Sequence, residues 1–474
     1  GITLHEQVEL GLRELVRAGR LAPGTRLPSS RALASTLGVS RGVVLEAYAQ
    51  LTAEGYLGAS PGAPTRVASA PSAERPPVPA SSVEQGAGQR LDPGRPDLAS
   101  FPRESWLRSL RVALRDASFQ TLADADPRGR PELRNVLMDY LVRARGAAPE
   151  PEHTLICGGF TQAFAALCRT LRERGVQRIA VEAPGWHRHR LIAESAGLEA
   201  IPVPVDGDGV SARALADSRC EAVVLTPAHQ YPTGVVLAPE RRTALLEWAE
   251  DRDGLIVEDD YDSELRYDRV PVGALQGLAP ERVCHVGSAS QRLAPGVRIG
   301  WILSPSWLTG ALTYEQAVTG GGGPVLDQLA LADFIARGEL DRHLRRMRTR
   351  YRARREALAD AVARELPGAV MTGVAAGLFA PVSFPGVAPE VLAAAAALGI
   401  GEPIAPLELD PGRPAAPAPV LLLGFGGYGE RSIGDAVAAL AGLVIEFPRD
   451  ARQHRGDRQD LPGGHVRRRA GEDP

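Results

Sequence analysis

Short apolar runs alternate with helical stretches along most of this chain, and this alternation limits the possible folds more than any other feature. Between residues 91 and 447 the runs RIAVEA, EAVVLTPA, GLIVEDD and RVCHVGSAS have the length and character of buried parallel strands. A further strand is predicted at VLLLGFGG. The alternation predicts an α/β domain with a mostly parallel sheet and helices on both faces, and a smaller C-terminal α+β subdomain.

The length and composition indicate a multidomain protein of the cytosol. A chain of 474 residues is too long for one ordinary core, so two or three domains are expected. No apolar run approaches the ~20 residues of a membrane span, and the start GITLHEQVELGLREL is amphipathic rather than a signal peptide. The cysteines are scattered without a CxxC pair, which predicts a reducing compartment, no metal site and small buried side chains at Cys157, Cys168, Cys220 and Cys284.

Composition divides the chain into four segments. Residues 1–68 are predicted to form a compact helical domain, and residues 69–90, rich in Pro, Ser, Ala and Gly, a flexible linker. Residues 91–447 carry the α/β pattern, and residues 448–474 are nearly devoid of apolar side chains, which predicts a disordered tail. Residues 334–358 place an apolar stripe on one helical face and arginines on the others. We expect a solvated or interfacial helix there, with DNA binding as the alternative.

The N-terminal domain has the start and stop signals of two short helices joined by a tight turn. One of the two serines before residue 31 is placed to cap a helix over 31–37, and Gly38 is placed to end it. Ser40 is placed to cap a second helix over about 41–54, which Gly55 ends. The pattern predicts a helix-turn-helix.

In a helix-turn-helix the first residues of the second helix enter the major groove of DNA, here Arg41, Gly42 and Val43. The following GYLGASPGAPTRVAS has two apolar runs around a Pro/Gly turn, which suits the hairpin of a winged helix. Seven arginines and five glutamates give residues 1–68 a net charge of only +2. Charge therefore leaves open a helical bundle that binds no DNA.

The run from EQVELGLREL to LTAEGYL resembles the winged-helix domain of GntR-family transcription regulators over nearly its whole length. The resemblance implies that Arg31 and Arg41 contact phosphates and base edges and that Ser30 and Ser40 contact the DNA backbone. It also implies that the wing enters the adjacent minor groove. The wing tip PGAPTRV departs from the family's usual Gly-Ser-Gly-Thr and aromatic, although Arg66 could bind a phosphate there.

Four segments of the large domain place polar or aromatic groups at strand ends. Gly158-Gly159 in ICGGFTQAF opens a helix whose backbone N–H groups suit an anion. Trp186 in VEAPGWHRHR could stack on a planar ligand, although a core position is the more common role of a lone tryptophan. TPAHQYPTG and LIVEDDYDSELRY contribute polar groups at two further strand ends, and a phosphate would be suited by Ser288, Ser290 and Arg298.

These segments, in this order, resemble the fold-type-I aminotransferases, and together with the N-terminal domain the chain is similar to MocR/GabR-type regulators over roughly residues 2–447. The resemblance implies a pyridoxal phosphate pocket in which the phosphate is cradled at the helix start, Trp186 stacks on the ring, and Asp259 and Tyr261 hold its nitrogen and phenolic oxygen. The cofactor-binding residues that it implies are Gly159, Phe160, Thr161, Trp186, Tyr231, Asp259, Tyr261, Ser288, Ser290, Gln291 and Arg298.

The chain contains no lysine, and all 54 of its Lys and Arg residues are arginine. In the family the Ser-x-Ser of GSASQRLAPGVRIGW is followed directly by the lysine that forms an imine with pyridoxal phosphate, and here that position is Gln291. A carboxamide does not condense with an aldehyde, so ordinary transamination is excluded. The arginine that clamps a substrate carboxylate is also missing, with Leu422 in its place. Arg188 is left as a candidate effector ligand, and we assign packing roles to Gln162 and Phe379.

The favoured interpretation is a cytosolic transcription regulator that binds an operator as a head-to-tail homodimer and senses a small-molecule effector. Pyridoxal or pyridoxamine phosphate is bound without a covalent bond, or the pocket takes a different molecule or none. A pyridoxal- or pyridoxamine-phosphate enzyme with a vestigial DNA-binding domain is the alternative from another class, and a dimeric scaffold without effector is a third.

Overall fold

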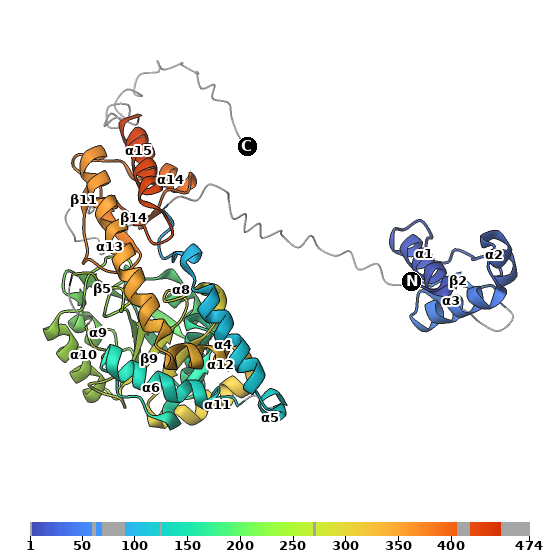
Figure 1. Cartoon of the computed structure of the whole chain (residues 1–474), viewed down its shortest axis with the longest axis horizontal. Coiled ribbons are helices and arrows are strands. Elements are labelled where there is room, and N and C mark those ends of the chain that lie inside the picture. Colours follow the sequence, from blue (N-terminus) through green and yellow to red (C-terminus); the bar gives the residue numbers. More distant parts are fainter. Residues whose placement is uncertain are drawn as a thin grey trace, which may run out of the picture. The chain divides into compact units, whose positions relative to one another are not determined.

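The computed structural model describes residues 2–58, 63–68, 91–123, 126–268, 272–404 and 418–446. The chain divides into two compact units, Gly1–Glu84 and Gln85–Pro474, here called the N-terminal unit and the large unit (Figure 1). The predicted linker, residues 69–90, and the predicted tail, residues 448–474, lie outside the described residues.

The N-terminal unit is a helix-turn-helix followed by a hairpin, as the sequence predicts. The Ser29 hydroxyl accepts from the backbone N–H of Ala32, Ser40 accepts from that of Val43, and Gly38 ends the first helix of the motif with φ 67°. These caps satisfy backbone donors that the first turn of a helix leaves free. The elements are α1 (Leu4–Arg17), α2 (Ser30–Leu37), α3 (Arg41–Ala53), and the antiparallel pair β1 (Leu57–Gly58) and β2 (Arg66–Val67).

The large unit is built on an eight-stranded sheet of the predicted, mostly parallel kind. The strands lie in the order β3-β10-β9-β8-β7-β4-β5-β6, and in this sheet β10 and β6 run antiparallel to their neighbours. Their bounds are β3 (Thr154–Cys157), β4 (Arg178–Ala183), β5 (Glu199–Asp206), β6 (Gly209–Val210), β7 (Ala222–Leu225), β8 (Leu255–Asp260), β9 (Val283–Ser288) and β10 (Gly300–Leu303).

Helices cover both faces of this sheet because successive strand residues point to opposite sides. Leu155 and Cys157 of β3 pack in one apolar cluster with α7, whereas Ile156 between them packs in another with α6 and α12. All four cysteines are free and buried, as predicted. The helices that precede the second sheet are α4 (Arg103–Asp116), α5 (Phe119–Ala123), α6 (Pro131–Arg145), α7 (Phe160–Glu173), α8 (His187–Ser195), α9 (Ala212–Asp217), α10 (Pro239–Asp251), α11 (Ser306–Thr319), α12 (Val325–Ala336) and α13 (Glu339–Glu365).

The C-terminal part is a smaller α+β subdomain with the antiparallel strand order β11-β12-β14-β13. Helix α13 covers the predicted segment 334–358 from Glu339 onward and packs along α15 (Figure 1). Its predicted stripe is buried at Leu340, Leu344, Met347, Tyr351 and Leu358. The remaining bounds are β11 (Val370–Met371), β12 (Phe379–Ser383), α14 (Pro389–Ala397), β13 (Glu402–Pro403), β14 (Val420–Gly424) and α15 (Glu430–Glu446). None of the described helices is long and apolar enough to cross a membrane.

Candidate functional site

The strand ends that carry the predicted pocket residues meet at one edge of the large sheet. Strands β4, β7, β8 and β9 are parallel, so their carboxyl ends share that edge. Strand β10 begins there, because Gly300 lies opposite both Ser288 at the end of β9 and Cys157 at the end of β3. The glycine pair and the other pocket segments therefore leave the sheet on the same side.

The groups predicted to hold a phosphate lie together at this edge. Gly159 caps α7 with φ 103°, and Phe160 and Thr161 form the first turn of that helix. A methyl group on Gly159 would lie 3.8 Å from the Ser288 hydroxyl, and one on Gly158 would lie 4.0 Å from a terminal nitrogen of Arg298. Among the described residues no carboxylate pairs with the Arg298 guanidinium. Its charge is therefore free to attract an anion.

An aromatic wall and a buried carboxylate form the next side of the pocket. The ring of Trp186 meets that of His189 edge-on at 5.3 Å, and the Phe160 ring lies 5.9 Å from Trp186. His189 Nε2 lies 3.1 Å from Asp259 Oδ2, while the buried Oδ1 of Asp259 has no hydrogen-bond partner. Burial raises the pKa of Asp259, and the hydrogen bond to His189 opposes that rise. A ligand N–H would satisfy the free oxygen.

Tyr261, the predicted partner of a phenolic oxygen, bonds within the protein. Its hydroxyl donates to the carbonyl oxygen of His229 at 2.7 Å, and burial raises the pKa of Tyr261 well above its ordinary value. His229 is held from its other sides by Asp262, at 2.8 Å, and by the stacked ring of Phe379, at 5.0 Å. Phe379 thus has the packing role that the sequence predicts. The Tyr261 hydroxyl would have to turn to meet a ligand.

The positions considered for an effector carboxylate differ in exposure. Leu422 is 1% exposed within β14, so no cation stands at that strand position. Arg188 is exposed, and its guanidinium carbon lies 5.9 Å from the centre of the Trp186 ring. The Tyr231 hydroxyl donates to Glu402 at 3.2 Å. Arg188 is therefore a cation that lies beside the aromatic wall.

Gln291 is held in place by its neighbour Arg292. The buried Arg292 guanidinium donates to Glu264 at 2.8 Å and to the carbonyl oxygen of Ser288 at 2.6 Å, which fixes the turn that carries Gln291. A methyl group on Gly94 would lie 3.6 Å from Gln291 Nε2. The buried Oε1 of Gln291 has no hydrogen-bond partner.

Three parts of this site were missed from the sequence. His189 supports Asp259, Gln162 accepts a hydrogen bond from the backbone N–H of Gly158, and Gly94 lies beside Gln291. The assignment of Gln162 to packing was incomplete because its amide occupies a backbone donor at the anion cradle. Only the spacing of His189, three residues after Trp186, gave a signal, since that spacing places two side chains on one helical face.

Glu182, near the end of β4, makes a pH-dependent contribution to the free energy of unfolding. Its Oε2 accepts from the backbone and hydroxyl of Thr226 and from Gln230, yet burial raises the pKa of Glu182 to about 7. Because the folded-state pKa lies above the unfolded value near 4.5, this contribution to stability is present at acidic pH and is lost as the pH rises through about 7.

We expect Glu182→Gln to raise the free energy of unfolding at about pH 8 and to leave it nearly unchanged at about pH 4, because the amide stays neutral while its oxygen keeps the three donors. All five tryptophans lie in the large unit, so urea unfolding followed by tryptophan fluorescence measures this effect there. An equal change at both pH values would contradict the assignment.

In the N-terminal unit, the arginines at the helix-turn-helix are exposed and free of carboxylates. Arg41 Nε donates to the Ser30 hydroxyl at 3.3 Å, and no carboxylate pairs with Arg31 or Arg41 among the described residues. Arg13 on α1, in contrast, is neutralised by Glu54 at 2.7 Å. Arg31 and Arg41 therefore carry uncompensated positive charge, although the net charge of residues 1–68 is small.

Some of the other residues predicted to contact DNA also make contacts within the protein. Ser40 caps α3, Gly42 is exposed in its first turn, and Val43 is half-buried. Arg66 on β2 is exposed, but one terminal nitrogen donates to the carbonyl oxygen of Gly24 at 2.8 Å. The wing residues 59–62 lie outside the described residues.

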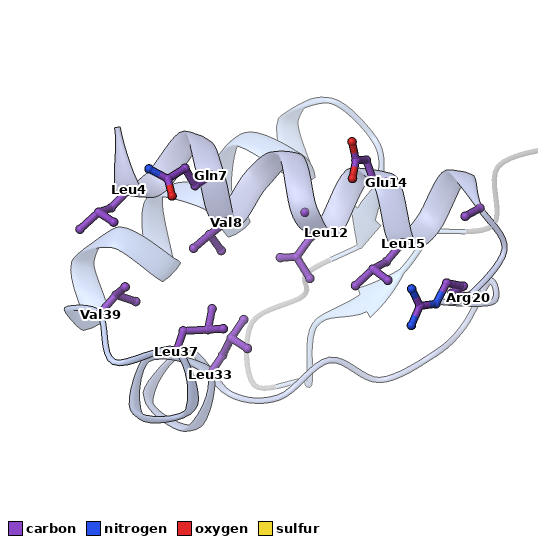
Figure 2. Close-up of a pocket in the computed structure, with 12 residues that line it drawn as sticks. Leu4, Gln7, Val8, Leu12, Glu14, Leu15, Arg20, Leu33, Leu37 and Val39 are labelled. Atoms are coloured by element: carbon purple, nitrogen blue, oxygen red, sulfur yellow. The ribbon is translucent and has the colours of Figure 1, made fainter. Parts of the chain in front are cut away.

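A groove runs between α1 and α2 on the N-terminal unit (Figure 2). Its volume is about 730 Å³, and Leu12, Leu15 and Leu33 are among the side chains that point into it. Neither Arg31 nor Arg41 lines this groove. Its apolar walls do not suit a phosphate backbone, so it is separate from the predicted DNA surface.

Comparison with known proteins assigns each of the two units to a protein family. Residues 4–67 match the bacterial regulatory proteins of the gntR family, and residues 100–398 match the aminotransferases of class I and II. The pyridoxine biosynthesis transcriptional regulator PdxR of Corynebacterium glutamicum is 36% identical over 386 residues, which are 80% of this chain and 83% of the relative. The chain belongs to the MocR-type transcriptional regulators. It is a DNA-binding regulator with an aminotransferase-like domain.

Other relatives agree with this assignment. The probable rhizopine catabolism regulatory protein MocR of Rhizobium meliloti is 34% identical over 386 residues, covering 77% of this regulator and 78% of the relative. Among solved structures, the kynurenine aminotransferase of Pyrococcus horikoshii, in complex with pyridoxamine phosphate, superposes with a TM-score of 0.67 at 25% identity. The superposition covers 77% of this chain and 92% of that enzyme, so the large unit has the fold-type-I aminotransferase architecture.

Proposed function

We propose that this MocR-type regulator binds a vitamin B6 phosphate in the pocket of its large unit without a covalent bond, and that occupancy of the pocket controls DNA binding. The proposal includes a cytosolic location, a head-to-tail homodimer that presents two winged helices to paired half-sites, and no transaminase activity. Pyridoxal phosphate and pyridoxamine phosphate share the phosphate and the ring that the pocket suits.

The proposal rests on where residues 91–94, the first described residues after the predicted linker, lie in the large unit. Leu91 is fully buried, and its carbonyl oxygen accepts from the backbone N–H of Gly424 at 2.8 Å. The Tyr428 hydroxyl accepts from the backbone N–H of Asp92 at 3.1 Å, and Gly94 lies beside Gln291. A ligand that shifts Gln291 therefore acts on the segment that leads into the predicted linker.

The residues present fit a vitamin B6 phosphate. The Gly158-Gly159 turn, Ser288 and the unpaired Arg298 suit its phosphate, and the unpartnered Oδ1 of Asp259 suits a protonated ring nitrogen. When bound, the group supplies an electron-withdrawing ring with an aldehyde or amine arm. The chain lacks a lysine to hold that arm covalently, so these non-covalent contacts carry its affinity.

The test is a gel shift on the DNA upstream of the protein's own gene, with and without pyridoxal and pyridoxamine phosphate, together with an absorbance scan. We expect a shift that depends on the ligand and the absorbance of a free aldehyde or amine. No shift on any DNA would contradict a sensor that controls DNA binding. A gel shift that neither ligand changes would favour a dimeric scaffold or a sensor of another effector. Turnover of an amino donor would favour the enzyme interpretation.

We expect Arg41→Ala to weaken operator binding by about tenfold or more and to lower the slope of log affinity against log salt concentration by about 1, because the variant loses an uncompensated cation at the start of α3. Arg20→Ala is the control, since Arg20 lies in the α1–α2 groove rather than beside Arg41. Fluorescence anisotropy over a salt series measures both. Equal losses in the two variants would contradict the assignment of Arg41.

A further inference from the structure

Two oxygen atoms in the pocket are buried and lack a donor. Asp259 Oδ1 and Gln291 Oε1 are both shielded from solvent and make no hydrogen bond. Buried polar atoms in folded proteins are nearly always paired, because an unpaired atom keeps its full desolvation cost. The two oxygens are therefore expected to meet N–H or O–H groups of the ligand.

The carboxylate of Asp259 and the turn that carries Gln291 are both held by neighbouring groups. Asp259 is fixed through its other oxygen by His189, at 3.1 Å. Gln291 sits on the turn that the Arg292 guanidinium ties to Glu264 and to the carbonyl oxygen of Ser288. A methyl group on Gly94 would lie 3.6 Å from Gln291 Nε2, so the amide presents its nitrogen to that side.

We propose that Gln291 makes the pocket selective for the amine form of the B6 phosphate over the aldehyde form. This inference rests on the proposed non-covalent site. An aldehyde oxygen only accepts hydrogen bonds, so it would place lone pairs against those of Gln291 Oε1. An amine or ammonium group donates and satisfies that oxygen. The ligand thus brings the amine that lysine supplies in the aminotransferases.

Selectivity is measured as the ratio of dissociation constants for pyridoxal and pyridoxamine phosphate, followed by quenching of tryptophan fluorescence. Phosphate and ring contacts are common to both ligands and cancel in the ratio. The buffer contains neither primary amines nor phosphate, because the first react with the aldehyde and the second competes for the anion cradle. The 4-deoxypyridoxine phosphate, with a methyl group at the reactive carbon, is the third ligand.

We expect pyridoxamine phosphate to bind about tenfold to a hundredfold more tightly than the other two ligands, the range of a charge-assisted hydrogen bond. Gln291→Met has a similar length without an amide oxygen and should bring the ratio to within about threefold of one. Gln291→Glu keeps an acceptor and should restore the preference. Gln177→Met, at an exposed glutamine of the same unit, should keep the wild-type ratio.

Each result decides the inference. Equal affinities, or tighter pyridoxal phosphate, would overturn it while leaving the non-covalent site intact; the second result would mean that the amide presents Nε2 to the ligand. If Gln291→Met kept the preference for pyridoxamine phosphate, another residue would be responsible for that preference, and the inference would also be overturned. Binding of none of the three ligands would reject the proposed site itself. Circular dichroism of each variant establishes that it is folded.

Discussion

Replacing Gln291 with lysine should convert the regulator from a non-covalent into a covalent receptor of pyridoxal phosphate. The lysine Nζ attacks the aldehyde carbon, water leaves, and a carbon–nitrogen double bond forms that borohydride reduces to a stable secondary amine. We expect about one equivalent of pyridoxal phosphate per chain after reduction and dialysis in Gln291→Lys, and no stoichiometric labelling in the wild type, which contains no lysine. Mass spectrometry of the reduced protein and the imine absorbance measure this gain.

The control for this gain is Gln177→Lys, which adds one lysine at an exposed position of the same unit. A surface lysine should be labelled slowly and incompletely, because nothing holds the phosphate and ring beside it. If both variants were labelled alike, or if the wild type trapped a stoichiometric amount, Gln291 would not occupy the position of the cofactor lysine.

Arg292→Leu should destabilise the large unit by about 3–5 kcal/mol, because it leaves the buried Glu264 without its counter-charge and Asp260 with Arg145 alone. The Arg292 side chain is 1% exposed and lies 2.6 Å from Glu264 and 3.6 Å from Asp260. The guanidinium of Arg145, and after it that of Arg292, hold the pKa of Asp260 well below its usual range against the effect of burial. Urea unfolding followed by tryptophan fluorescence measures the loss in the large unit alone, since the N-terminal unit contains no tryptophan.

Two further variants separate the buried charge from lost volume. Arg282→Leu removes an arginine that pairs with the exposed Glu250 and Asp253, and it should cost less than about 1 kcal/mol. The double variant Arg292→Leu with Glu264→Gln should recover part of the loss, because it removes the carboxylate that lost its counter-charge. A double variant no more stable than the single one would show that packing, and not charge, dominates at this position.

Much of the fold could be predicted because it depends on local chemistry. Ser40 and Gly38 mark helix ends through the backbone groups that they satisfy or the φ that they tolerate, and the structure has both where the sequence places them. The buried parallel strands were recognisable because strands covered on both faces must be apolar throughout. The antiparallel course of β10 was not predicted, since strand direction depends on how the chain returns to the sheet.

The pocket was predictable only in part. The turn segments were recognisable in the sequence as polar or glycine-rich residues at strand ends. The resemblance to the aminotransferases then indicated that they belong to one pocket. The pairing of His189 with Asp259, seventy positions apart, left no local trace. The contact of Gly94 with Gln291 and the anchoring of Arg292 by Glu264 were equally hidden. Such contacts require the packed sheet, because only the tertiary fold brings distant side chains within hydrogen-bond distance.

The sequence by itself determined which covalent chemistry this regulator can perform, because a chain without lysine has no side-chain amine for an aldehyde, however it folds. It also determined the helix-turn-helix, through caps that act within a few residues. Only the tertiary structure decided which acceptors lack a donor and which residues stand beside the start of the large unit. Those properties arise from burial, since an oxygen is left without a partner only when packing has excluded water from it.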